Sequence, residues 1–208
     1  YLALPLRTSP DTLHRNVHQE KMFGIFQEYQ SWVRIMGVPT VGDVNSKVLA
    51  GDGGGLIKLA EAFHERKFAW VADTIYDAHL SRGARMVLIS GPSSSGKTTS
   101  AHKLAEELER QGTPARVVSL DNFFRGAQYY PRLPDGTLDY ENPDTLDLPL
   151  IKQCLHQLSE TGKTELPIYD FATEQRAAAV EPIDLQGGVC IVEGIHALNP
   201  ELTGLVPD

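Results

Sequence analysis

Residues 85–99 read RMVLISGPSSSGKTT, a short apolar run that leads directly into a turn rich in glycine and serine. The turn at residues 91–98 fits the pattern G-x-x-x-x-G-K-[ST], which is the phosphate-binding loop or P-loop. The apolar run is typical of a buried strand, and residues 98–110 have the pattern of a helix. A strand, a glycine-rich turn and a helix in this order predict the start of an α/β fold with a parallel sheet.

The residues of this turn have the chemistry to hold phosphate groups. Glycine lets the backbone turn where a Cβ would clash, so that successive N–H groups point at phosphate oxygens, and the following helix adds its positive end. We expect ATP to bind here, with Lys97 reaching the β- and γ-phosphates and the Thr98 hydroxyl binding Mg²⁺. The alternative is a plain turn beside a surface lysine. The predicted nucleotide-binding residues are Gly91, Ser93, Ser94, Ser95, Gly96, Lys97, Thr98 and Thr99.

Two carboxylates directly follow apolar runs further along the chain. Glu193 ends the run at residues 189–192, and Asp121 follows the run at residues 115–120. Open α/β sheets bind ligands at the carboxyl ends of their strands. We predict that Glu193 helps to place the metal ion, and that Asp121 takes a proton from an attacking hydroxyl or helps to hold Mg²⁺. The alternatives are a glutamate in solvent and an aspartate that caps the loop at Asn122.

The rest of the chain indicates two regions. Residues 1–82 have helical patterns, and residues 83–208 alternate strands with helices. We predict an α/β fold: a P-loop NTPase-type parallel sheet with flanking helices, preceded by a small helical segment. A sheet of this kind normally continues after its last strand here, so we expect further elements beyond Asp208. The other elements expected in the second region are strands at residues 115–120, 164–168 and 188–193, a helix at 148–158 and a long loop at 119–140.

Composition narrows the class of protein. The 208 residues are 41% hydrophobic and 22% charged, which is ordinary for a soluble globular protein. We find neither a run of about 18 apolar residues, as a membrane span needs, nor a secretory signal pattern. Cys154 and Cys190 are too few for a disulfide framework and lack zinc-site spacing, so we expect a cytoplasmic protein without a membrane partner.

Charge is distributed unevenly along the chain. Residues 1–84 carry 9 basic and 9 acidic side chains, whereas residues 85–208 carry 10 basic and 18 acidic ones. This excess of acid argues against an extended nucleic-acid surface. It does not argue against a phosphate ligand, which a local nest of N–H groups and a metal ion can hold. A homo-oligomer stays open at this point.

Four motifs resemble those of the uridine kinase / phosphoribulokinase family, in particular its long bacterial uridine kinase-like nucleoside kinases. They are GPSSSGKTT at residues 91–99, SLDNFF at 119–124, LPIYDF at 166–171 with Arg176 downstream, and VEGIHALNP at 192–200. The resemblance covers residues 85–203. Residues 61–75 are also similar to the helical segment that precedes the kinase in the long forms. The arginine-rich lid and the last strands of the family would lie beyond Asp208.

The resemblance implies roles for residues of the loop after the second strand. Asp121 matches the catalytic base that takes the proton from the 5′-hydroxyl of a nucleoside. Phe124 matches an aromatic residue near the substrate. Tyr140 and Glu141 match an aromatic–acid pair that holds the nucleoside, although uridine kinases carry aspartate where this chain has Glu141.

The resemblance implies substrate contacts for the segment around residues 169–176 as well. Tyr169 and Arg176 match the YDF…R part of the substrate pocket. Uridine kinases usually carry a histidine two residues before that arginine, where this chain has Glu174. His196, which follows Glu193, is predicted to be an ordinary loop histidine, and the alternative is that it approaches the same site.

We therefore expect Mg²⁺-dependent transfer of the γ-phosphoryl group of ATP to a hydroxyl, most of all the 5′-hydroxyl of a nucleoside such as uridine or cytidine. Asp121 and Lys97 are the expected catalytic residues. One alternative is another acceptor, such as a sugar phosphate or a pantothenate-like molecule. A phosphorylated acceptor would need further cations in residues 122–176, where five basic residues face many acids. The other alternative is a nucleotide-binding regulatory module without turnover, which would have no use for a base at Asp121.

Overall fold

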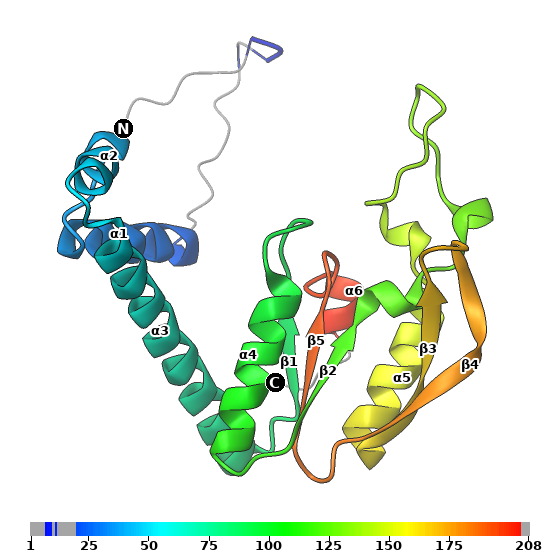
Figure 1. The fold of residues 1–208 in the computed structure, drawn as a ribbon. Helices are drawn as coiled ribbons and strands as arrows, with labels where there is room; N and C mark the ends of the chain where they lie inside the picture. Colours follow the sequence, from blue (N-terminus) through cyan, green and yellow to red (C-terminus); the bar gives the residue numbers. More distant parts are fainter. Residues whose placement is uncertain (1–6, 10, 12–19, 205–208) are drawn as a thin grey trace. The chain divides into compact units, whose positions relative to one another are not determined.

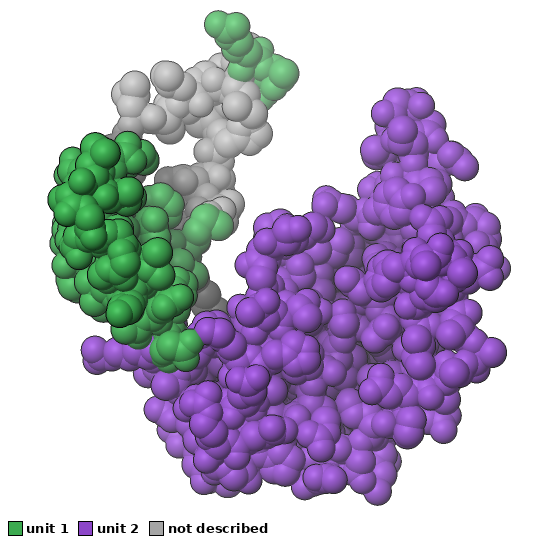
Figure 2. All heavy atoms as spheres, in the orientation of Figure 1, with its two compact units in different colours: residues 1–65 green, residues 66–208 purple. Residues whose placement is uncertain are grey.

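The chain divides into two compact units, which are described separately here (Figures 1 and 2). A computed structural model describes residues 7–9, 11 and 20–204. The units meet between Glu65 and Arg66, inside the helix α3 (Gly53–Arg82). The boundary expected at residue 82 is where α3 ends, whereas the division by packing lies one half-helix earlier.

Residues 20–65 of the first unit are mainly helical. The helices are α1 (Glu20–Ile35), α2 (Val41–Leu49) and the first part of α3. Thr40 starts α2 with a capping box, in which its side chain and that of Asp43 each bond the other's backbone N–H. The ring of Trp32 in α1 stacks on Phe63 in α3 with ring centroids 5.3 Å apart. This contact and the buried Val33 anchor α1 within the unit.

The second unit is built on a parallel sheet, which confirms the predicted fold class (Figure 1). Its strands are β1 (Met86–Ile89), β2 (Ala115–Ser119) and β5 (Val189–Glu193), in the order β1-β5-β2. Every residue of the central strand β5 is buried. The register places Ile89 of β1 and Ser119 of β2 level with Glu193. The carboxyl ends of the three strands therefore meet at one edge of the sheet.

Both faces of this sheet are covered by packed side chains. Alternate residues of β5 point to opposite faces and therefore contribute to two different clusters. Ile191 packs in a cluster with α4 (Lys97–Arg110) and the second part of α3, where Ala72 is fully buried. Cys190 and Val192 pack in a second cluster with α5 (Leu148–Thr161). The predicted flanking helices are thus present, and the second part of α3 is one of them.

The predicted strand at residues 164–168 forms, but its expected place in the parallel sheet is wrong. It belongs to β3 (Lys163–Asp170), which pairs antiparallel with β4 (Gln175–Asp184) in a separate two-stranded sheet. The reason is local, because a four-residue turn at 171–174 closes a hairpin before the chain returns to the main sheet. The long loop predicted at 119–140 contains two 3₁₀ turns, η1 (Leu120–Phe123) and η2 (Ala127–Tyr129). After it come η3 (Pro143–Thr145) and, later, the short helix α6 (Pro200–Thr203).

Candidate active site

The P-loop runs from the end of β1 to the start of α4, and its backbone is tightly curved. Ser94 and Gly96 both have left-handed conformations, with φ of 60° and 84°. A Cβ on Gly91 would lie 2.9 Å from Ser95 Oγ and 3.5 Å from Lys97 Cγ, so a larger residue would fill the space inside the loop. The Lys97 ammonium donates a hydrogen bond to the Pro92 carbonyl oxygen at 2.9 Å. A glycine-lined cradle with a lysine on its rim fits a chain of phosphate groups.

Glu193 and Thr98 lie together at the carboxyl end of the sheet. Glu193 is only 3% exposed, and its Oε1 accepts a hydrogen bond from Thr98 Oγ1 at 3.0 Å. The contact joins the last residue of β5 to the first turn of α4. A hydroxyl and a carboxylate oxygen are the hard ligands that Mg²⁺ takes beside phosphate oxygens. The donor set of this pair therefore fits the metal ion expected here.

Asp121 belongs to η1, directly after β2, and the Ser119 hydroxyl caps this turn by accepting a hydrogen bond from the Asp121 N–H at 3.3 Å. The pKa of Asp121 is raised above its ordinary value, first by the protein that surrounds it and then by the charge of Glu193. The positive charge of Lys97 acts in the opposite direction. Asp121 thus lies within electrostatic reach of both Glu193 and Lys97, three residues that are far apart in the sequence.

Five aromatic rings form a cluster, and the first of them, Phe124, lies three residues after Asp121 in the chain. Ring centroids are 5.5 Å apart for Phe124 and Tyr169, 5.5 Å for Tyr130 and Tyr140, and 5.0 Å for Tyr169 and Phe171. The hydroxyl oxygens of Tyr130 and Tyr169 lie 3.0 Å apart, within hydrogen-bond distance. Tyr130 and Phe171 are absent from the predicted site residues. Phe171 is the last residue of the LPIYDF motif, so that motif could have predicted it as a site residue. Tyr130 lies in a loop without periodicity, where no such pattern exists.

The loop after β5 connects several parts of this site. The Ser90 hydroxyl, at the end of β1, donates to the Ile195 carbonyl oxygen at 2.7 Å. His196 Nε2 lies 2.8 Å from the Glu141 carbonyl oxygen, an acceptor that requires the ring N–H as donor. This contact connects the loop after β5 to the backbone of Glu141, one of the predicted substrate residues.

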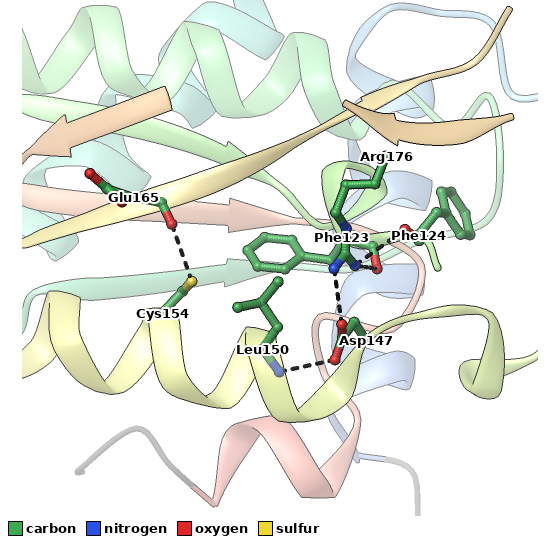
Figure 3. A network of polar contacts seen from close by, with 7 residues as sticks. All are labelled: Phe123, Phe124, Asp147, Leu150, Cys154, Glu165 and Arg176. Carbon is green, nitrogen blue, oxygen red and sulfur yellow. Dashed lines mark hydrogen bonds and ion pairs between the residues drawn. The ribbon is translucent and has the colours of Figure 1, made fainter. Parts of the chain in front are cut away.

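Arg176 reaches from β4 to groups of the protein itself, as Figure 3 shows. Its Nη1 donates to Asp147 Oδ2 at 3.1 Å, and its Nη2 donates to the carbonyl oxygens of Phe123 at 3.4 Å and Phe124 at 3.3 Å. The other oxygen of Asp147 accepts from the Leu150 N–H at 3.2 Å, which caps α5. Arg176 thus joins β4, η1 and α5.

Comparison with known proteins decides the family of this fold and site. Residues 86–202 match the model of the Phosphoribulokinase / Uridine kinase family. The chain belongs to this family. The resemblance inferred from the motifs at residues 91–99, 119–124, 166–171 and 192–200 is therefore confirmed.

Individual members of the Phosphoribulokinase / Uridine kinase family are similar at a moderate level. Uridine kinases from Lactobacillus johnsonii and Lactobacillus helveticus are 32% and 34% identical over 116 and 122 residues. The matches cover 54% and 57% of this chain and 53% and 56% of theirs. The chain therefore spans about half the length of the curated relatives that it matches.

Two solved structures of P-loop kinases share this fold. One is a protein provisionally designated a fructose transport system kinase, from Silicibacter sp. TM1040, with a TM-score of 0.57 and 28% identity. That match covers 66% of this chain and 70% of the other. The other is a possible uridine kinase from Bacillus stearothermophilus, with a TM-score of 0.55, 24% identity, and coverage of 67% and 76%. Among the described helices of this family member, none is long and apolar enough to span a membrane.

The structure brings most of the predicted residues of this kinase-family chain into two groups. Lys97, Thr98, Asp121 and Glu193 gather at the end of the sheet beside the P-loop. Phe124, Tyr140 and Tyr169 form part of the aromatic cluster. Glu141 is next to that cluster in the chain, and its carbonyl is held by His196. Arg176 differs from the rest, because the protein already occupies two of its three guanidinium nitrogens.

Proposed function

We propose that this chain carries the catalytic core of an ATP- and Mg²⁺-dependent kinase that phosphorylates a hydroxyl of a small molecule, most favourably the 5′-hydroxyl of a nucleoside such as uridine or cytidine. One observation carries the proposal. Asp121 lies within electrostatic reach of Lys97 and Glu193, and Phe124, three residues later in the chain, belongs to the aromatic cluster. This supports Asp121 as the group that acts between the residues that would hold the phosphates and those that would hold the acceptor.

The phosphate-holding part has to bind a chain of negative charge. The P-loop N–H groups and the N-terminus of α4 provide partial positive charge, and Lys97 exchanges its bond to the Pro92 carbonyl for the phosphates. Thr98 and Glu193 would hold Mg²⁺, with Asp121 as a further carboxylate. When bound, the ion supplies neutralisation of the phosphate charge.

Asp121 would activate the acceptor. Its carboxylate takes the proton of the acceptor hydroxyl as the hydroxyl oxygen forms a bond to the γ-phosphorus. The bond from that phosphorus to the β–γ bridging oxygen breaks, and ADP leaves. The raised pKa of Asp121 makes its carboxylate a stronger base than an ordinary aspartate.

The aromatic cluster would hold the acceptor. Rings from three segments of the chain meet there, and Tyr140 and Phe171 are more than half exposed, so their surfaces are open to a ligand. Flat aromatic faces stack on nucleobases with little dependence on which base it is. The side chain of Glu141, which follows Tyr140, would accept hydrogen bonds from sugar hydroxyls. These features support a nucleoside more than an aliphatic acceptor.

The test is acceptor-dependent ADP production by the full-length protein with Mg-ATP and a panel of nucleosides, ribulose 5-phosphate and pantothenate. We expect turnover on a nucleoside, and a fall in kcat of about 10²–10⁴-fold in Asp121→Asn, since general-base catalysis contributes that much. ATP binding should persist in this variant. Glu160→Gln, an exposed acid near the far end of α5, is the matched control and should leave turnover unchanged. No turnover on any acceptor, with ATP bound equally by both proteins, would favour a regulatory module instead.

A further inference from the structure

We propose that Arg176 and Asp147 form a latch that positions the η1 turn, and that Arg176 therefore serves catalysis through the protein rather than by touching the acceptor. The catalytic part of this inference rests on the proposed function, because Asp121 is carried by that turn. The latch itself is defined by Arg176, Asp147 and the carbonyl groups of Phe123 and Phe124 (Figure 3).

The guanidinium of Arg176 bonds to the protein in two directions. One terminal nitrogen forms an ion pair with Asp147, and the other donates to the two carbonyls of the η1 end. The side chains of Arg176 and Asp147 are only 30% and 26% exposed, so the pair is partly shielded from water. A planar fork that bonds in two directions fixes its partners relative to each other, which a lysine ammonium does less well.

The latch holds a segment at the end of η1 that also pairs with residues 145–147. The Arg125 N–H donates to the Thr145 carbonyl at 2.9 Å, and the Asp147 N–H donates to the Phe123 carbonyl at 2.9 Å. These bonds make residues 123–125 and 145–147 a short antiparallel pair, with Phe124 bridged to Leu146. Arg176, in β4, donates hydrogen bonds to the carbonyl oxygens of the same segment, which begins two residues after Asp121. The end of the turn is therefore held from two sides.

Asp147 links the latch to the rigid core. Asp147 uses one carboxylate oxygen for Arg176 and the other to cap α5. Ile151, Leu155 and Leu158, along the inner face of that helix, are almost completely buried. The latch thus ties the η1 turn to a helix that cannot shift without opening the core.

A direct contact between Arg176 and the acceptor would disrupt this arrangement. Both terminal nitrogens are already bonded, and the remaining nitrogen, Nε, is buried without a partner among the described residues. Turning the guanidinium toward a ligand would leave the Asp147 carboxylate with its charge uncompensated in a partly shielded place, which is costly. The positioning role requires no such change.

A double-mutant cycle separates the two roles. Arg176→Gln removes the charged fork, and Asp147→Asn removes the charge while keeping an oxygen that can cap α5. We expect each variant to lower kcat by about tenfold to a hundredfold with little change in the KM values for Mg-ATP and acceptor, because misplacing a catalytic group has effects of that size. The double variant should be no worse than the worse single one. A raised acceptor KM in Arg176→Gln alone, with Asp147→Asn unaffected, would overturn the proposal.

Hydrogen exchange tests the latch without any turnover. The amides of Arg125 and Asp147 should exchange faster in both single variants, whereas those of β5 should not. Lys152→Gln is the matched control, because it removes another ion pair of α5, with Glu201 at 3.0 Å, outside this network. It should change neither exchange nor kcat. Unchanged exchange in Arg176→Gln and Asp147→Asn refutes the latch, whereas a wild-type protein inactive on every acceptor refutes the proposed function.

Discussion

At the scale of single residues, the pKa of Asp121 is set first by burial and then by two charged neighbours of opposite sign. Burial and Glu193 raise the pKa of Asp121, while Lys97 lowers it. A base acts only when it is deprotonated, so acidification should reduce turnover at a higher pH than an ordinary aspartate would dictate. The same two neighbours are the groups proposed to hold the metal ion and the phosphates, so the proposed donor-binding residues would also set the pKa of the proposed base.

This balance predicts opposite shifts from two substitutions. Lys97→Met removes the cation, so the pKa of Asp121 should rise further. Glu193→Gln removes the neighbouring anion, so the pKa should fall toward its ordinary value. Carboxyl NMR titration of the protein without nucleotide measures both, and Glu160→Gln should leave the pKa unmoved. Shifts in the same direction for both variants would contradict the arrangement described here.

The acidic residues of the site could be predicted from the sequence because each follows an apolar run. Strand ends are easily located, and parallel strands bring their carboxyl ends to one edge, which places Asp121 and Glu193 by a general rule. Tyr130 could not be found in this way. It joins the aromatic cluster through a loop whose path depends on tertiary contacts, such as the hydrogen bond to Tyr169.

At the scale of secondary-structure elements, β4 shows what local pattern cannot reveal. Its residues 175–184 read QRAAAVEPID, with three alanines and a proline, and most of them are exposed. The strand forms because it pairs with β3 along nearly its whole length, and the sequence of β4 carries no pattern that predicts this pairing. By contrast, β5 is apolar from Val189 to Val192 and is buried throughout, so it is evident from the sequence.

The contact between two elements predicts the effect of one small substitution. A Cβ on Gly194, just after β5, would lie 2.8 Å from the Leu120 Cβ at the start of η1. Gly194→Ala should therefore push the η1 turn, lower the free energy of unfolding by about 1–3 kcal/mol and reduce kcat. Chemical denaturation and steady-state kinetics measure the two effects.

Gly24→Ala in α1 provides the control for that substitution. A Cβ at Gly24 meets nothing within 4 Å, and alanine favours a helix over glycine by about 1 kcal/mol. The control should be neutral or stabilising and leave kcat intact. Equal losses in both variants would show that the space around Gly194 is not what limits the site.

At the scale of the whole molecule, the long helix α3 contributes to both compact units. Its second part, with Phe68, Val71, Ala72 and Ile75, packs in the apolar cluster that covers one face of the sheet. A boundary set by helical pattern alone, at residue 82, would cut this cluster in two. Burial therefore assigns residues 66–82 to the second unit, as the division between Glu65 and Arg66 indicates.

Two shortened proteins test this assignment. Removal of residues 1–65 should leave the parallel-sheet unit folded and able to bind Mg-ATP. Removal of residues 1–82 takes the side chains of α3 out of the cluster and should cost a further 2–5 kcal/mol or so of stability, roughly the effect of truncating a large core side chain. Urea unfolding compares the two. Equal midpoints would show that the second part of α3 does not support the sheet.

The two buried cysteines can report local unfolding of this chain through the rates at which they are alkylated. Burial raises the pKa of Cys190 to about 12 and raises that of Cys154 as well, so neither is a thiolate in the closed protein. An alkylating reagent can then react only during moments of exposure, and its rate counts those moments. Cys190 lies in the central strand, whereas Cys154 faces β3 from α5, with its Sγ 3.5 Å from the Glu165 carbonyl oxygen. Cys154 should therefore be labelled faster than Cys190. Its labelling rate would report local opening of the β3–β4 hairpin, and that of Cys190 would report unfolding of the parallel sheet.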